Sequence, residues 1–294
     1  MTANRPESKI LLDSGDPEET RQMKALLGFL DGQTTNPTYV SKNPEVQRRA
    51  TSGHKLTWDE QKQEYRRIVS EISPLVGAGG VSVEVFADLD TTADKMLSQG
   101  EEMFSWIPNA YIKYPCTREG LRAAQLSVAR GMRVNMTLCF SQDQAAAVYA
   151  ATRGTKEVCY VSPFVGRLDD IGEDGISLVR NIKKMYERGD GHVHVLAASL
   201  RGLDHLLAAF ALKSELITAP IKVLEQWAAA KFPLPGNDFR YKAADRNGKP
   251  LNSIPYKDLD LSTSWDRFDV RHDLTDKGIK KFVEDYKSTI ASVA

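Results

Sequence analysis

The sequence lacks an excess of charge of either sign. Lysine and arginine together count 39, and aspartate and glutamate together also count 39, so the formal net charge is zero. Proteins that bind nucleic acid or acidic lipid by charge carry a surplus of lysine and arginine, which this composition does not provide. We therefore expect neither nucleic acid nor a membrane as a partner.

Long hydrophobic runs are also missing. The segment from Met1 to Lys9 has no apolar core of the signal-peptide kind. No apolar stretch approaches the roughly 20 residues that a membrane helix needs. With 41% hydrophobic and 27% charged residues, the chain has the composition of an ordinary globular protein. A cytoplasmic location is expected.

Cysteine is scarce, and no glycine-rich phosphate loop follows the first predicted strand. The three cysteines are odd in number and lack CxxC spacing, which favours reduced, buried thiols over disulfides or a zinc site. The glycines of Gly77-Ala-Gly79-Gly80 precede a predicted strand instead of opening a helix, so they indicate a turn. The sequence therefore gives little support to a nucleotide cofactor, and no metal site is expected.

What the sequence does contain is an alternation of short β-branched runs and longer amphipathic stretches. The predicted strands are Lys9–Asp13, Gly32–Asn36, Val81–Asp88, Ala110–Pro115, Arg133–Phe140, Glu157–Phe164, His192–Ser199 and Leu216–Ala219. The predicted helices between them are Glu18–Leu30, Thr92–Phe104, Arg118–Arg130, Asp143–Arg153, Ile176–Glu187 and Leu203–Leu212. Eight strands in this alternation predict an α/β protein with a single domain over residues 1–294, folded as a (β/α)8 TIM barrel.

Two segments depart from the alternation. Thr57 and Glu60 form a capping-box pattern that opens an extra helix after the second strand. Residues 231–272 are rich in proline, glycine, asparagine and charge, and we interpret them as a long surface loop that lids the barrel or forms a homo-oligomer contact. Helical spacing then returns, which predicts a C-terminal helix over residues 273–294.

Polar residues fall in or beside strands that should be buried. Lys113 lies within the apolar run from Asn109 to Pro115, where an ammonium group is costly unless it is paired, neutralised or used. In a parallel barrel, the carboxyl ends of the strands meet at one face, which carries the active site. The polar residues on or just after the strands are Asp13, Asn36, Glu84, Lys113, Asn135, Thr137, Ser162, Arg167, Ser199 and Arg201. Because two arginines can clamp an anion, a phosphorylated polar substrate is predicted.

Several strings resemble the transaldolase family, in the family's order and approximate spacing. They are Gln33-Thr-Thr-Asn-Pro37, Val81-Ser-Val-Glu-Val85, Tyr111-Ile-Lys-Tyr-Pro-Cys-Thr117, Val134-Asn-Met-Thr-Leu138, Ser162-Pro-Phe-Val-Gly-Arg-Leu-Asp169 and Ala198-Ser-Leu-Arg201. The third of them is similar to the family's Schiff-base lysine motif. The resemblance covers residues 10–224, and the region after Phe232 does not match.

This resemblance implies a set of catalytic roles. Lys113 would attack the C2 carbonyl of a ketose phosphate and form an imine that acts as an electron sink. Asp13 would take the proton from the C4 hydroxyl, so that the C3–C4 bond breaks, and would return it to the acceptor aldehyde. Glu84 and Thr137 would hold and activate the water that leaves during imine formation.

The resemblance also implies the substrate contacts. Asn36, Asn135 and Ser162 would hydrogen-bond the retained dihydroxyacetone unit. That unit would pass from sedoheptulose 7-phosphate or fructose 6-phosphate to an aldose phosphate, as in the pentose phosphate pathway, with no metal or organic cofactor. The implied phosphate ligands are Arg167, Ser199 and Arg201.

Ordinary explanations exist for individual residues. Lys113 is also explained as a strand-end lysine that reaches solvent, and Asp13 as a turn or helix-capping residue. Arg167 is also explained by a surface ion pair with Asp169 or Asp170.

Two other functions are open at this point. The fructose-6-phosphate aldolase type resembles transaldolase but releases the three-carbon unit, and it has tyrosine at the Phe164 position and glutamine at the Glu84 position, so these residues favour transfer. A non-catalytic sugar-phosphate-binding protein would keep the anion clamp without turnover.

The sequence also departs from the family beside the predicted Schiff-base lysine. Tyr114 and Cys116 are larger than the residues that the family has there, and we expect them to narrow the pocket.

Overall fold

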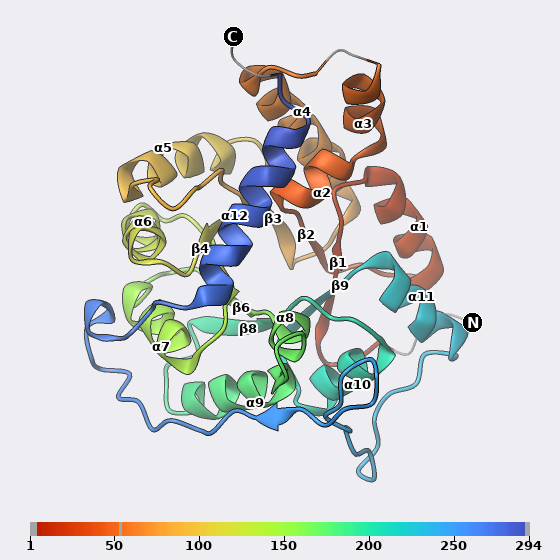
Figure 1. Ribbon diagram of the computed structural model, residues 1–294, viewed down its shortest axis with the longest axis vertical. Helices are drawn as coiled ribbons and strands as arrows, with labels where there is room; N and C mark the ends of the chain where they lie inside the picture. The colour runs from red at the N-terminus through yellow and green to blue at the C-terminus, as the bar shows by residue number, and fades with distance from the viewer. Residues whose placement is uncertain (1–4, 53–54, 292–294) are drawn as a thin grey trace.

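The computed structural model describes residues 5–52 and 55–291 and contains a closed barrel of parallel strands (Figure 1). The barrel strands are β1 (Lys9–Asp13), β2 (Gly32–Thr34), β3 (Gly80–Glu84), β4 (Ala110–Pro115), β5 (Val134–Cys139), β6 (Cys159–Pro163), β8 (Val193–Ala197) and β9 (Leu216–Ala219). They pair in chain order, and β9 pairs with β1 to close the ring. The predicted (β/α)8 barrel is confirmed.

Three of the predicted strands match in both bounds, and the others were predicted too long at their carboxyl ends. The reason is that the residues just past a strand already belong to the loop that turns into the next helix. Asn36, for example, follows β2 and caps α2, and Phe164 follows β6 and precedes α8. The βα loops therefore begin where the predicted site residues stand.

Helices cover the outside of the barrel in a ring (Figure 1). They are α1 (Pro17–Leu27), α5 (Ala93–Phe104), α6 (Arg118–Ala129), α7 (Gln142–Ala151), α9 (Gly175–Tyr186), α10 (Leu203–Ala211) and α11 (Ile221–Ala229). The short α8 (Val165–Asp169) lies inside this ring, directly after β6. Three of the outer helices begin at a hydroxyl cap, because Thr92, Thr117 and Ser141 each accept a hydrogen bond from a backbone N–H of the first turn. The short α8 and the helix α11 were not predicted.

The chain between β2 and β3 forms three α-helices instead of the one predicted. They are α2 (Pro37–Lys42), α3 (Pro44–Thr51) and α4 (Trp58–Ile72), followed by the 3-10 turn η1 (Ser73–Leu75). The predicted capping box at the start of α4 is confirmed, since Thr57 and Glu60 exchange hydrogen bonds. The missed helices begin at Asn36-Pro37 and Asn43-Pro44, where an asparagine cap precedes a proline, and this signal was present in the sequence.

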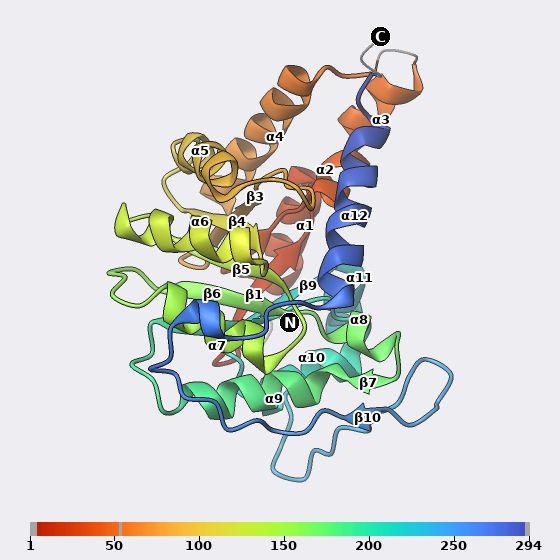
Figure 2. The same ribbon diagram turned by 60° about the vertical axis from the view of Figure 1, so that its left-hand side comes forward.

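The last helix, α12 (Asp273–Ser288), lies across the open end of the barrel, drawn in blue in Figures 1 and 2. Its first turn is held by Thr275 Oγ1, which donates to the Leu138 carbonyl at 3.0 Å. The helix ends before the predicted bound because the chain then pairs with Leu56 at Ile290. The ends of the predicted domain and helix, residues 1–4 and 292–294, lie outside the described residues.

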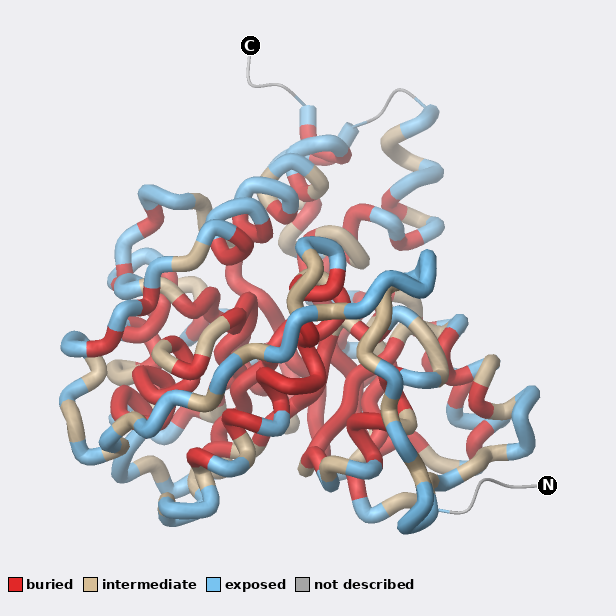
Figure 3. Tube along the Cα trace, turned by 60° about the horizontal axis from the view of Figure 1, so that its bottom comes forward, coloured by how far each residue is buried: buried red, intermediate tan, exposed pale blue. Residues whose placement is uncertain are grey.

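Residues 231–272 run along the outer side of the barrel and contain two short elements, β10 (Asn252–Ser253) and the 3-10 turn η2 (Trp265–Arg267). β10 pairs with β7 (Glu173–Asp174), and Asn181 of α9 donates to the Ile254 carbonyl at 2.8 Å. Figure 3 shows this segment mostly exposed and the strands buried. It supplies no residue to the cavity at the barrel mouth, so the expectation of a lid is wrong, and α12 covers that end instead.

Membrane-spanning helices and clusters of metal-binding side chains are both missing from residues 5–52 and 55–291. No helix there is both long and apolar enough to cross a membrane. Within the same ranges, no group of three or more histidine, cysteine or acidic side chains is placed to hold a metal ion.

Candidate active site

Lys113 and Glu84 lie on neighbouring strands at the same level of the barrel. Glu84 ends β3 and is in register with Lys113 of β4. Lys113 Nζ lies 3.0 Å from Glu84 Oε2, and it donates to the Thr35 carbonyl oxygen at 3.0 Å. The contact between Lys113 and Glu84 is a buried ion pair, and Glu84 Oε2 has no other hydrogen-bond partner among the described residues. Burial raises the pKa of the Glu84 carboxyl, and the charge of Lys113 opposes that rise.

Asp13 is the last residue of β1 and faces the same space. Its Oδ1 accepts a hydrogen bond from Thr34 Oγ1 at 2.7 Å. Desolvation raises the pKa of the Asp13 carboxyl, although the charge of Lys113 and hydrogen bonds from Thr34 and Tyr39 act in the opposite direction. A carboxyl whose pKa is raised above its ordinary value is suited to take a proton and return it.

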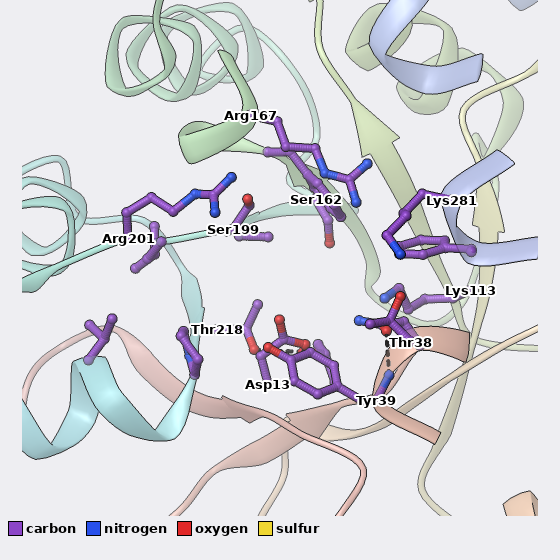
Figure 4. Close-up of a pocket in the computed structure, with 18 of the residues that line it drawn as sticks. Asp13, Thr38, Tyr39, Lys113, Ser162, Arg167, Ser199, Arg201, Thr218 and Lys281 are labelled. Carbon is purple, nitrogen blue, oxygen red and sulfur yellow. Dashed lines mark hydrogen bonds between the residues drawn. The ribbon is translucent and has the colours of Figure 1, made fainter. Parts of the chain in front are cut away.

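A cavity of about 480 Å³ opens above Asp13 and Lys113, between the barrel and α12, and Glu84 does not line it. This volume is in the range of small-molecule sites. Figure 4 shows Ser199 between Arg167 and Arg201 on one side of the cavity, with Asp13 and Lys113 across from them. The predicted residues that line it are Asp13, Asn36, Lys113, Ser162, Phe164, Arg167, Ser199 and Arg201.

The two arginines of the cavity differ in their partners. The Arg167 guanidinium lies between the rings of Phe164 and Phe282, 5.2 and 5.4 Å from their centres. It has no hydrogen bond or ion pair with any residue that the structure describes, so its explanation as a partner of the neighbouring aspartates is wrong. Arg201 Nη2 donates to Asp170 Oδ2 at 2.6 Å on the exposed rim. Arg167 therefore keeps its full set of donors for an anion in the cavity.

Asn135 and Thr137 of β5 do not line the cavity. Ser162 Oγ, which does, donates to Asn135 Oδ1 at 2.7 Å, and Asn135 Nδ2 donates to Ser82 Oγ at 3.0 Å. Thr137 Oγ1 is buried and has no hydrogen-bond partner among the described residues. The structure thus places Asn135 behind Ser162. A direct contact of Asn135 with substrate and the water-holding role of Thr137 stay predictions.

Asn36 combines a structural contact with a place in the cavity wall. Its Oδ1 accepts from the Tyr39 backbone N–H at 3.0 Å and so caps α2. Its Nδ2 makes no hydrogen bond with the described part of the chain and remains available as a donor. Asparagine at this position therefore fixes the loop and can still serve a ligand.

Sequence reasoning missed a second set of lining residues. Thr34 and Thr218 lie on β2 and β9, and their hydroxyl oxygens are 2.7 Å apart, so inward hydroxyls on predicted strands were a usable signal. No local signal indicated which side chains α12 would place over the mouth. The missed residues that line the cavity include Thr34, Thr38, Tyr39, Lys42, Thr218, Lys222, Lys281, Phe282 and Asp285.

The expectation that Tyr114 and Cys116 narrow the pocket is wrong. Neither residue lines the cavity. Side chains alternate along a strand, so Tyr114 points to the opposite side from Lys113, toward the helices. Its hydroxyl lies 2.9 Å from Ser127 Oγ on α6, and it packs so closely on α5 that a Cβ at Gly100 would meet it at 2.0 Å.

The sequence of the chain matches a known protein family over nearly its whole length. Residues 10–293 match the sequence model of the Transaldolase/Fructose-6-phosphate aldolase family, so the match extends well beyond the 10–224 range of the resemblance. The solved structure of an enolase of the mandelate racemase subgroup from Agrobacterium tumefaciens covers 76% of this chain and 57% of its own chain, with a TM-score of 0.45 at 12% identity. This similarity is too low to indicate a function.

Curated relatives agree with the family match. A probable transaldolase of Syntrophomonas wolfei is 33% identical over 95% of this chain and 98% of its own length. One of Caulobacter vibrioides is 32% identical over 97% of this chain and 99% of its own. One of Herpetosiphon aurantiacus is 37% identical over 77% of this chain and 89% of its own. The chain belongs to the transaldolase/fructose-6-phosphate aldolase family.

Proposed function

We propose that the protein is a transaldolase that moves a dihydroxyacetone unit from a ketose phosphate to an aldose phosphate through a Schiff base on Lys113. The observation that carries the proposal is the pairing of Lys113 with Glu84 at 3.0 Å. Lys113 lines a cavity together with Asp13 and with Arg167, which has no ion pair within the described part of the chain. A nucleophilic amine, two carboxyls with raised pKa and an anion-binding guanidinium are the groups that this chemistry needs.

In the proposed reaction, Lys113 Nζ passes a proton to Glu84 and attacks the C2 carbonyl as a neutral amine. Glu84 then gives that proton to the carbonyl oxygen, which leaves as water. Asp13 accepts the C4 hydroxyl proton, the C3–C4 bond breaks, and its electrons move into the imine to give an enamine and a free aldose phosphate. The enamine carbon then attacks the acceptor aldehyde, Asp13 returns its proton to the new hydroxyl group, and water releases the product from Lys113. No electron donor or acceptor is consumed.

The residues around this centre are suited to holding the two sugars. Arg167 and Arg201 would bind the phosphate, in the arrangement of Figure 4, with Ser199 between them. Asn36 and Ser162 would hydrogen-bond the hydroxyl groups of the retained unit from the cavity wall. Such contacts keep the enamine in place until the acceptor arrives, which is the requirement of a transferase.

Product analysis tests the proposal and separates its alternatives. With fructose 6-phosphate and erythrose 4-phosphate together, a transaldolase forms sedoheptulose 7-phosphate and glyceraldehyde 3-phosphate, and it releases little dihydroxyacetone. An aldolase releases dihydroxyacetone without any acceptor. A binding protein forms neither product. Phe164 brings a ring without a hydroxyl group into the cavity, which favours the transferase outcome.

A further inference from the structure

Tyr65 brings a buried hydroxyl group from the inserted helix α4 to the ends of β2 and β3. Its side chain lies on the inner face of α4, and the residue is 2% exposed. The ring packs edge-on against Trp106, with 6.0 Å between ring centres. The hydroxyl group lies 2.5 Å from Thr35 Oγ1 and accepts a hydrogen bond from the Glu84 backbone N–H at 2.8 Å.

The direction of these hydrogen bonds follows from the number of protons available. Thr35 Oγ1 donates its proton to the Ser82 carbonyl at 2.7 Å, so it can only accept from Tyr65. Tyr65 therefore donates to Thr35 and accepts from Glu84, which requires a neutral phenol. Burial raises the pKa of Tyr65 and keeps it in that form.

The hydroxyl group of Tyr65 stands where the β2–β3 ladder would otherwise continue. Thr35 N–H donates to the Ser82 carbonyl, and in a parallel ladder the next bond would run from the Glu84 N–H to the Thr35 carbonyl. Tyr65 takes the Glu84 N–H instead. The Thr35 carbonyl is thereby left to Lys113 Nζ, which donates to it at 3.0 Å.

We propose that Tyr65 is a positioning residue for the imine-forming step. By accepting the Glu84 N–H, its hydroxyl group holds Glu84 beside Lys113 and keeps the Thr35 carbonyl open as the lysine's anchor. Tyr65 touches neither sugar, because it does not line the substrate cavity. This inference rests on the proposed function, since it assigns a role in the Schiff-base chemistry at Lys113.

The test compares Tyr65→Phe with a matched control. Without the hydroxyl group, the Glu84 N–H turns to the Thr35 carbonyl and competes with Lys113. We expect kcat and the rate of borohydride-trappable imine formation to fall by about 10- to 100-fold, because Lys113 Nζ then shares or loses the Thr35 carbonyl, and a buried donor without its partner costs about that much. KM for fructose 6-phosphate should stay within about twofold, because the sugar contacts are intact.

Tyr114→Phe is the control, because it removes one buried tyrosine hydroxyl from the strand that carries Lys113, on the side facing Ser127. Both variants should lose similar stability in urea, and only Tyr65→Phe should lose kcat. Equal kcat in the two folded variants would overturn the inference. If Tyr65→Phe does not fold, Thr35→Val removes the acceptor that orients the Tyr65 hydroxyl group, and a wild-type kcat in that variant would then overturn the inference.

The outcomes also separate this inference from the proposed function. Wild-type protein that forms no adduct on Lys113 would refute the function itself. Wild-type protein that forms the adduct, with Tyr65→Phe equally fast, would refute only the role of Tyr65.

Discussion

The two ends of the barrel interior carry different kinds of side chain, although only two residues separate them on the same strands. We call the amino-terminal ends of the strands the lower end and the carboxyl ends the upper end. At the lower end, Tyr111 of β4 stacks on Tyr160 of β6, with 4.1 Å between ring centres, and Arg133 lies over the Tyr111 ring. Two residues further along, the same strands present Lys113 and Ser162 to the cavity. The lower end is filled by rings that stabilise the fold, whereas the upper end holds ionisable groups at a cost that only function explains.

Exchange of Lys113 for methionine should show the largest effect at the upper end. Lys113→Met removes the nucleophile, so turnover should fall by about a thousandfold or more, as when other covalent nucleophiles are deleted. Binding of fructose 6-phosphate should persist, because the phosphate contacts are made by other residues. Turnover assays and calorimetric titration of the sugar check both parts, and a variant with wild-type turnover would refute the mechanism.

The corresponding change at the lower end should affect stability and spare chemistry. Tyr160→Ala removes the ring that stacks on Tyr111, and it should lower the free energy of unfolding by about 3–5 kcal/mol. Urea unfolding measures this loss. At a temperature where the variant is folded, kcat should remain near that of the wild type. A large drop in kcat without loss of stability would erase the contrast between the two ends.

A third change divides the upper end into binding and chemistry. Arg167→Lys keeps the positive charge but loses the forked donors and the flat group between two phenylalanine rings. KM for fructose 6-phosphate should rise by about 10- to 100-fold, in line with the loss of a bidentate contact to phosphate. Steady-state kinetics with dihydroxyacetone-donating sugars that lack phosphate supply the control, because their KM should change little. Equal effects on both kinds of sugar would assign Arg167 a structural role.

The smallest expected effect is that of Asp13→Asn, which should stabilise the fold by an amount that depends on pH. Burial raises the pKa of this carboxyl in the folded state, so its contribution to stability is complete below the unfolded pKa and is lost as pH rises through the folded value. Asp13→Asn mimics the protonated form and should unfold at higher urea than the wild type at neutral pH. The difference should disappear in acid, near the ordinary pKa of aspartate. A gain that is the same at every pH would contradict the assigned cause.

The barrel and the position of the candidate active site at the carboxyl ends of its strands were predictable, because both follow from local sequence patterns. The alternation located all eight barrel strands, although five of them were predicted too long, and Lys113 stood out as a cation within an apolar run. Packing between distant segments left no such pattern. Helical spacing indicated that α12 has a buried face, but not that this face would lie on the barrel mouth with Gly278 against Arg167. The contact of Tyr65 with Glu84 could not be predicted from the sequence either, because it joins the inserted helix α4 to the end of β3.

Borohydride trapping with fructose 6-phosphate tests the central claim most directly. After reduction, peptide mass analysis would locate any three-carbon adduct on the chain. We expect the adduct on Lys113, in wild-type protein and not in Lys113→Met. An adduct on another lysine, or none in folded protein that binds the sugar, would contradict the Schiff-base assignment.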